Sequence, residues 1–87
     1  MTPQQLSELI TSGIPGAEVD VQDLTGTGDH FSVEVVAAAF EGKRMVEQHR
    51  MVYAAVGSAM AGPVHALALK TLTPTERQQR GRSLRTS

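Results

Sequence analysis

The chain has 87 residues, of which 40% are hydrophobic and 20% charged, and its formal net charge is −1. A chain of this length forms one small domain that buries only about 60% of its unfolded surface, so its core should be small. Because it contains no cysteine, disulfides, a cysteine nucleophile and a thiolate metal site built from this chain alone are excluded.

The charges are unevenly distributed along the chain. Residues 1–42 hold seven acidic residues and no Lys or Arg, whereas residues 43–87 hold eight basic residues and two acidic ones. No segment reaches the roughly 20 apolar residues of a membrane span, and the first residues lack the basic and apolar regions of a secretion signal. We therefore expect a soluble, cytoplasmic protein with no membrane partner.

A first helix is predicted over residues 3–12. Thr2 is a suitable N-cap and Pro3 a suitable first helical residue. Gly13 is expected to end the helix. The apolar residues recur at helical spacing and should form the buried stripe: Leu6, Leu9 and Ile10.

Two strands joined by a turn follow. The segment "AEVDVQDL" alternates apolar and polar residues, which predicts a half-exposed strand with Val19 and Val21 on one face. The Gly- and Thr-rich run "TGTGDH" predicts the turn of an antiparallel hairpin. The second strand should begin at His30 or Phe31 and continue through "FSVEVVAAA" to a turn at "FEGK".

A longer second helix is predicted for "KRMVEQHRMVYAAVGSAM", before "GP" at residues 62–63 stops it. Apolar and aromatic residues recur there at helical spacing and should form the buried face: Met45, Val46, His49, Val52, Tyr53, Val56, Ala59 and Met60. On this face we expect His49 to be a packed, hydrogen-bonded residue at the edge of the core and not a metal ligand.

The segment "VHALALK" predicts a third strand, with His65, Leu67 and Leu69 on one face. Thr73 and Glu76 then match the pattern of a capping box, which predicts a short last helix.

The arginine-rich end "RQQRGRSLRTS" has almost no apolar residue and no acidic one. Such a composition favours a disordered segment. We therefore divide the chain into a folded domain over residues 1–76 and a disordered basic tail over residues 77–87.

This order of elements predicts an α+β fold, α-β-β-α-β with an optional last helix, in which a three-stranded mixed sheet carries its helices on one face. The second helix crosses over between strands two and three, so these strands should run parallel and begin at the same end of the sheet.

His30 and His65 would then lie on neighbouring strands with backbones roughly 5 Å apart, close enough for both imidazoles to bind one metal. Two imidazoles are too few to hold iron or zinc tightly, so such a site would be shared or weak. The alternative is that each histidine is an ordinary turn or surface residue.

A second candidate site is a basic surface for nucleic acid or for an acidic partner. It would combine two groups of residues: Lys43, Arg44 and Arg50 on the second helix, and Arg77, Arg80, Arg82 and Arg85 in the tail. Few aromatic residues are available to stack on bases, so only modest, salt-sensitive binding is expected. The serines and acidic residues show no spacing typical of a catalytic triad or a carboxylate pair, and we expect no enzymatic activity.

Two segments, "GDHFSVEVVAAAFEGKRMVEQHRMVYAAV" and "GPVHALALKTLTPTE", closely resemble the BolA family, and the likeness extends from about Leu6 to Glu76. The combination of "DHF", "F-x-G", "HRMVY" and "HALALKT" is specific. The resemblance implies the α-β-β-α-β-α fold of that family, which is similar to a class II KH domain. Two positions depart from the usual pattern: Arg77 replaces an aromatic residue, and "AAAF" stands where a Ser-Asp pair is common.

The resemblance also implies a role. BolA-like proteins pair with monothiol glutaredoxins and share a bridging [2Fe–2S] cluster, to which the glutaredoxin side contributes a cysteine and a glutathione thiol. The BolA side contributes the histidine of "HAL", here His65, and a Cys or His of the loop before strand two, here His30, so this chain is similar to the histidine-bearing subtype. The leading prediction is a non-catalytic adaptor in iron–sulfur trafficking or in redox or iron sensing, which is a monomer or a weak homodimer when alone.

The runner-up prediction is a DNA-binding transcriptional regulator that uses the second helix and the basic tail. The resemblance attributes DNA binding to the second helix and the "F-x-G" turn, which would act as a helix-turn-helix-like element. The matching positions are Phe40, Gly42, Lys43, Arg44, His49 and Arg50. A third reading is an interaction domain whose histidines bind no metal.

Overall fold

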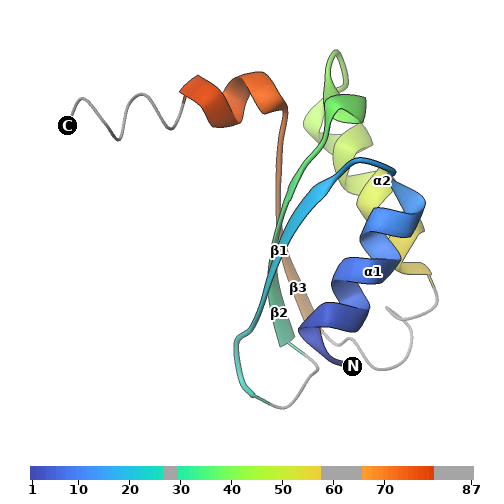
Figure 1. The fold of residues 1–87 in the computed structure, drawn as a ribbon, viewed down its shortest axis with the longest axis vertical. Coiled ribbons are helices and arrows are strands. Elements are labelled where there is room, and N and C mark those ends of the chain that lie inside the picture. Colours follow the sequence, from blue (N-terminus) through green and yellow to red (C-terminus); the bar gives the residue numbers. More distant parts are fainter. Residues whose placement is uncertain (27–29, 58–65, 80–87) are drawn as a thin grey trace.

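A computed structural model of the chain describes residues 1–26, 30–57 and 66–79 (Figure 1). The elements follow in the order α1 (Pro3–Gly13), β1 (Glu18–Asp23), β2 (His30–Val36), the 3₁₀ helix η1 (Ala38–Phe40), α2 (Met45–Val56) and β3 (Ala66–Leu72). Residues 74–79 form a further helix. None of the helices in these described segments is long and apolar enough to cross a membrane.

The strands form one mixed sheet in the order β1-β2-β3. β1 and β2 are antiparallel, and β2 and β3 are parallel. Figure 1 shows α1 and α2 together on one face of this sheet. The predicted α+β fold, with a three-stranded mixed sheet and its helices on one face, is confirmed, whereas the likeness to a class II KH domain stays a prediction.

The core lies between the sheet and the two helices. Because side chains alternate along a strand, Phe31, Val33 and Val35 of β2 point into the core, where each is at most 1% exposed. They pack against the apolar stripe of α1, the buried face of α2 and the side chain that follows β2 in η1: Leu6, Ile10, Val52, Val56 and Phe40. The predicted second strand extended through three alanines, but β2 ends at Val36 and the chain turns into η1.

Helix α1 begins as the sequence predicts. The hydroxyl of Thr2 accepts a hydrogen bond from the backbone N–H of Gln5 at 3.1 Å, and the side chain of Gln5 accepts one from the N–H of Thr2 at 2.9 Å. This reciprocal capping satisfies two N–H groups that the first turn of a helix leaves without partners.

Gly13 ends α1 as predicted and has a second role that the sequence did not show. It is the last residue of α1 and Ile14 is its C-cap. A Cβ atom added to Gly13 would lie 2.5 Å from the Cβ of Ala55 in α2. The missing side chain of Gly13 therefore allows α1 and α2 to approach closely.

The buried face of α2 differs from the predicted one. Gln48, Val52 and Val56 are buried, whereas Met45 is 67% exposed, Val46 49% and Tyr53 40%. The prediction was wrong for these three residues because it assigned the core by hydropathy alone and left out a polar residue, Gln48, whose amide is satisfied inside the protein. His49 is half-buried. Ala59 and Met60, also predicted on this face, lie outside the described residues.

The last helix is attached by polar contacts. Thr73 and Glu76 form the predicted capping box, with two bonds of 3.0 and 3.1 Å. Thr75 donates a hydrogen bond to Glu41 at 3.2 Å, and Arg77 forms an ion pair with Glu18 of β1. Residues 77–79, assigned to the tail by sequence, belong to this helix, and residues 80–87 lie outside the described part of the chain.

The close approach of α1 and α2 can be tested with Gly13→Ala. Alanine normally stabilises a helix by roughly 1 kcal/mol relative to glycine, but here the added methyl group would overlap Ala55, and overpacking of this kind costs about 1–3 kcal/mol. We expect a lower free energy of unfolding in urea. Ser12→Ala, at the neighbouring exposed position, should change it by less than about 0.5 kcal/mol. A stabilised Gly13→Ala variant would show that the two helices are not in tight contact.

Candidate functional site

The parallel pairing of β2 and β3 brings the starts of the two strands together. His30, the first residue of β2, is in register with Ala66, the first residue of β3. On its other side, the carbonyl of His30 accepts a 2.9 Å hydrogen bond from the N–H of Leu24. The predicted convergence of the two strand starts is confirmed as far as Ala66. His65, the other predicted ligand, lies outside the described residues.

His30 is on the face of the sheet that α1 and α2 do not cover. Its neighbour Phe31 points into the core, and side chains alternate along a strand, so His30 lies on the opposite face, where it is half-buried. Leu24, which is hydrogen-bonded to His30 through the backbone, is 60% exposed. The histidine therefore stands beside an exposed apolar side chain at this end of the sheet.

The side chains near His30 offer an incomplete set of metal ligands. Within residues 1–26, 30–57 and 66–79, no three His, Cys, Asp or Glu side chains are grouped so that they could hold a metal ion, and the whole chain lacks cysteine. Imidazole can replace thiolate as a ligand of a [2Fe–2S] centre, in which two histidines bind one iron and two cysteines the other. His30 alone is therefore an incomplete site, and a metal bound at this end of the sheet would need further ligands.

The predicted nucleic-acid-binding residues lie at the start and along the exposed side of α2. Lys43, Arg44 and Arg50 are all exposed. Arg44 is partly neutralised by Glu47, since its Nε atom lies 3.4 Å from the Glu47 carboxylate. Arg77 is paired with Glu18, so among the described residues the predicted basic surface consists mainly of the α2 cations. The arginines at positions 80, 82 and 85 lie outside the described residues.

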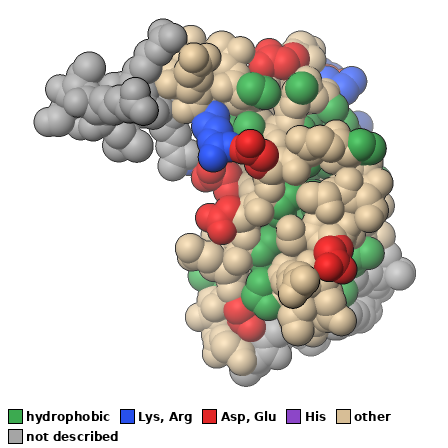
Figure 2. Space-filling view, in the orientation of Figure 1, with side chains coloured by type: hydrophobic (Ala, Val, Ile, Leu, Met, Phe, Trp, Pro, Cys, Tyr) green, Lys and Arg blue, Asp and Glu red, His purple; other side chains and the backbone are tan. Residues whose placement is uncertain are grey.

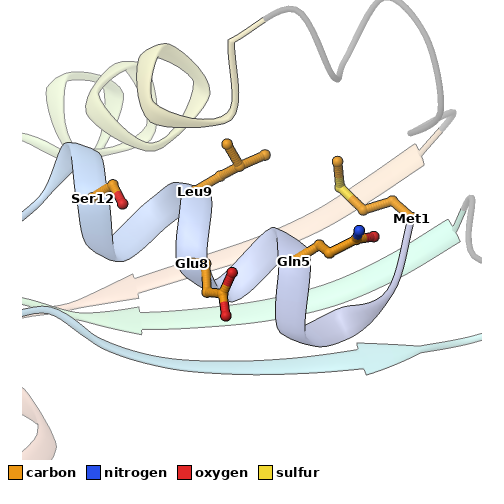
Figure 3. A pocket seen from close by; sticks show the side chains of 5 residues that line it. All are labelled: Met1, Gln5, Glu8, Leu9 and Ser12. Atoms are coloured by element: carbon orange, nitrogen blue, oxygen red, sulfur yellow. The ribbon is translucent and has the colours of Figure 1, made fainter.

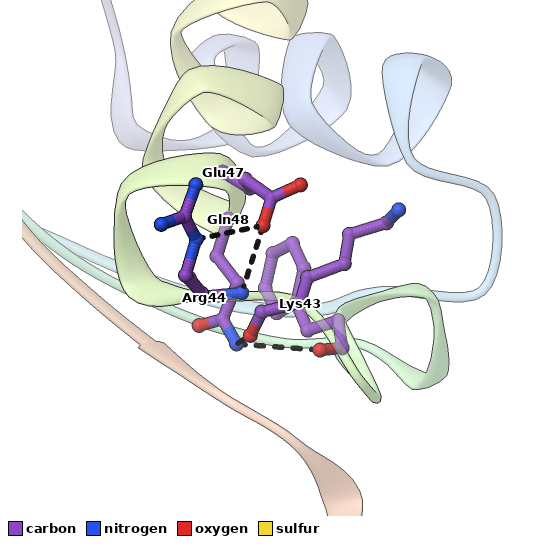
Figure 4. A network of polar contacts seen from close by, with 5 residues as sticks. Lys43, Arg44, Glu47 and Gln48 are labelled. Atoms are coloured by element: carbon purple, nitrogen blue, oxygen red, sulfur yellow. Dashed lines mark hydrogen bonds and ion pairs between the residues drawn. The ribbon is translucent and has the colours of Figure 1, made fainter.

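A buried polar network supports this basic turn, and sequence reasoning missed it (Figure 4). The side-chain amide of Gln48 donates to the carbonyl of Lys43 at 2.9 Å and to that of Phe40 at 3.3 Å, and its oxygen accepts a 2.6 Å bond from the hydroxyl of Thr71 in β3. Gln48 is 6% exposed. The network therefore joins the turn before α2, α2 itself and β3. The sequence signal was weak, because a glutamine one turn before Val52 is equally common on a solvent face.

The described surface has two hollows, one beside α1 and one over the outer face of the sheet. One, of about 530 Å³, is lined by one side of α1 and the residue before it (Figure 3): Met1, Gln5, Glu8, Leu9 and Ser12. The other, of about 120 Å³, lies over the outer face of the sheet: Glu18, Val19, Asp20, Glu34, Val36 and Arg77. Figure 2 shows acidic side chains along the side of the molecule where the sheet lies. Neither set of lining residues includes His30 or a cation of α2.

Comparison with known protein families shows which family this chain belongs to. Residues 12–76 match the family described as BolA-like protein. The chain belongs to this family. The predicted resemblance is thereby confirmed over most of the range in which the sequence showed it.

Several relatives bear names that give no enzymatic activity. The chain is 47% identical over 51 residues to BolA-like protein 1 of Bos taurus and 42% identical over 71 residues to Protein BOLA2 of Arabidopsis thaliana, which cover 59% and 80% of this chain. The matched segments are 38% of the bovine protein and 75% of the plant protein, so the chain spans about two fifths of the length of the first. It is also 41% identical over 51 residues to the "DNA-binding transcriptional regulator BolA" of Escherichia coli, over 59% of this chain and 49% of that protein.

Solved structures agree with the fold. A bolA protein homologue from Coxiella burnetii is 35% identical, has a TM-score of 0.78, and matches over 90% of this chain and 97% of its own. Yeast Fra2 is 34% identical with a TM-score of 0.73, over 91% of this chain and 86% of its own. The sheet order and the position of α2 are thus those of BolA structures.

The Gln48 network can be tested with Gln48→Met, which keeps the length of the side chain and removes its hydrogen bonds. Two carbonyls and the Thr71 hydroxyl would lose a partner in the interior, and each buried polar group without a partner costs about 1–3 kcal/mol. We expect the free energy of unfolding in urea to fall by about 2–4 kcal/mol. Gln4→Met, at an exposed position of α1, is the matched control and should have little effect. Equal stability of the two variants would contradict the role assigned to Gln48.

Proposed function

We propose that this chain is a non-catalytic adaptor or regulator that binds a monothiol glutaredoxin and shares a bridging [2Fe–2S] cluster with it and with glutathione, in iron–sulfur trafficking or in redox or iron sensing. The observation that supports this most directly is the register of the parallel strands, which places His30 beside Ala66. His65 is bonded to Ala66, and adjacent Cα atoms are only about 3.8 Å apart. Membership of the BolA-like family supports the same role.

The observed face of His30 and the predicted face of His65 limit where such a cluster can bind. His30 lies on the outer face of the sheet, whereas Leu67 and Leu69 of β3 pack against the core. The sequence predicts His65 on the same face as Leu67 and Leu69. A cluster bound by both histidines would therefore sit at the end of the sheet, where the two faces meet. A partner bound at this end would bring the thiolates.

Each group in this proposal has a defined chemical task. His30 and His65 bind iron through neutral imidazole nitrogens, so protonation of either ring competes with binding. Replacement of thiolate by imidazole also raises the reduction potential of a [2Fe–2S] centre. The exposed side chain of Leu24 gives the partner an apolar contact next to His30. We expect this assembly in the cytoplasm, and a monomer or weak homodimer when the chain is alone.

The cluster can be tested by co-purifying the chain with a monothiol glutaredoxin and glutathione. We expect an absorption and circular-dichroism spectrum of a [2Fe–2S] cluster that differs from the spectrum of the glutaredoxin homodimer. His65→Ala and His30→Ala should each change this spectrum, because each removes a nitrogen ligand. His49→Ala is the matched control, since His49 lies on α2 away from the start of β2. If all three variants give the wild-type spectrum, the ligand assignment is wrong.

The second candidate function is DNA binding by a transcriptional regulator. It is supported by the name of the Escherichia coli relative and by the exposed cations Lys43, Arg44 and Arg50 at the start and on the outer side of α2. The Gln48 network supports it as well, because it holds the turn that presents Lys43. In this function α2 would lie against the phosphate backbone.

DNA binding can be tested by titrating a mixed-sequence duplex at several salt concentrations. A phosphate contact releases counterions, so affinity should fall steeply as salt rises, and Arg50→Ala should reduce the salt slope by about 1. Arg77→Ala is the matched control, because this arginine is already paired with Glu18, and it should leave the slope unchanged. Binding that is independent of salt, or equally affected by both variants, would rule out α2 as the phosphate-binding surface.

A further inference from the structure

Strand β3 has one edge that no described strand pairs with. The carbonyl of Leu72 accepts a 3.2 Å hydrogen bond from the N–H of Ala37, at the end of β2, so the backbone groups of Leu72 face β2. Since the direction of N–H and C=O groups alternates along a strand, those of Leu67, Leu69 and Thr71 point away from β2. Within residues 1–26, 30–57 and 66–79 the sheet ends at this edge.

One flank of α2 lies over this side of the sheet. The contact of Ala55 with Gly13 shows which flank of α2 faces α1, and at 3.6 residues per turn Tyr53 lies about 160° around the helix from Ala55. Met45, His49 and Tyr53 are four residues apart and form a row along this opposite flank. α1 packs on β1, and α2 contacts β3 through the bond between Gln48 and Thr71. The row is therefore on the side of the free edge of β3.

This flank is apolar, exposed and bordered by positive charge. Met45 is 67% exposed and Tyr53 40%, and His49 is half-buried between them. Lys70 is exposed on β3. Neither β3 nor the row of Met45, His49 and Tyr53 contains an acidic residue. An apolar surface next to an open strand edge and an exposed lysine suits a partner that is extended, apolar and acidic.

We propose that the free edge of β3 and the Met45–His49–Tyr53 row of α2 bind an extended peptide segment of a partner protein, in which apolar and acidic residues alternate. The segment adds a fourth strand to the sheet through the backbone groups of Leu67, Leu69 and Thr71. Its apolar side chains face the row on α2. Its acidic side chains, on the other face of the sheet, lie beside Lys70, which is in register with Glu34 on the outer face.

Electrostatics favour a partner protein over a second copy of this chain. Pairing of β3 with β3 of a second copy would bring two Lys70 side chains to one interface, and like charges oppose such pairing. An acidic segment turns the same charges into attraction. This proposal does not depend on the cluster or on DNA binding, because it uses the edge of β3 and not the histidine end or the outer side of α2.

The test is amide hydrogen exchange by nuclear magnetic resonance, with a short synthetic peptide in which valine alternates with aspartate. We expect the peptide to slow exchange at the amides of Leu67, Leu69 and Thr71, which gain a hydrogen bond, and not at those of Ala68 and Lys70, which already face β2. A peptide in which lysine replaces aspartate should bind at least about tenfold more weakly. No added protection, or uniform protection without alternation, would overturn the proposed strand addition.

Variants test the side-chain contacts. Tyr53→Asp should weaken peptide binding by about tenfold or more, because an aromatic side chain that becomes buried on binding often contributes most to an interface. Lys70→Glu should weaken binding of the acidic peptide. Leu24→Asp is the matched control, since it makes the same kind of change at an exposed apolar residue beside His30. Wild-type affinity of Tyr53→Asp and Lys70→Glu would overturn the proposal. Protection of the same amides without peptide at high protein concentration would identify a second copy of the chain as the occupant and would overturn the proposal. Protection by a single-stranded oligonucleotide and not by the peptide would also overturn it.

Discussion

The parallel pairing of β2 with β3 determines where every candidate site lies. Parallel strands need a crossover between them, and α2 supplies it. Both strands therefore start at the same end of the sheet, so that His30 meets Ala66, and the other end closes with the bond from Ala37 to Leu72. An antiparallel β3 would start at the opposite end of β2 and would separate the two histidines by the length of the strand. The same pairing leaves β3 at the edge of the sheet.

The orientation of α2 depends on a polar contact and not on its most hydrophobic face. Gln48 satisfies two carbonyls of the preceding turn and the hydroxyl of Thr71, and the close contact of Gly13 with Ala55 fixes the flank beside α1. Because the Gln48 side of α2 faces the preceding turn and β3, and the Ala55 side faces α1, Met45 and Tyr53 remain outside the core. A helix rotated to bury them would move the Gln48 amide away from its three partners, at a cost of several kilocalories per mole. The exposed row on α2 is thus a consequence of the buried network.

The helices, the strands and the order of the sheet could be predicted from the sequence, whereas contacts between particular distant side chains could not. Alternation of apolar residues predicted β1 and β2, and capping patterns predicted the helix starts at Thr2 and Thr73. The helical crossover between the second and third strands then predicted their parallel pairing and the meeting of the strand starts. The burial of Gln48 could not be predicted, because it requires Thr71, which is 23 residues away. The role of Gly13 likewise depends on Ala55, and a glycine at a helix end is usually read as a local stop signal.

The two edges of the sheet have opposite charge, which follows from the uneven distribution of charges along the chain. β1 carries Glu18 and Asp20 on its exposed face, and the pair formed by Glu18 with Arg77 ties the last helix to that edge. The edge of β3 carries one charge, Lys70, among alanine and leucine residues. A single lysine is a common means by which an edge strand opposes pairing with its own copies. Here the same lysine would also orient an acidic segment toward β3 and away from β1. Selectivity for a partner and protection against self-association can thus come from one side chain.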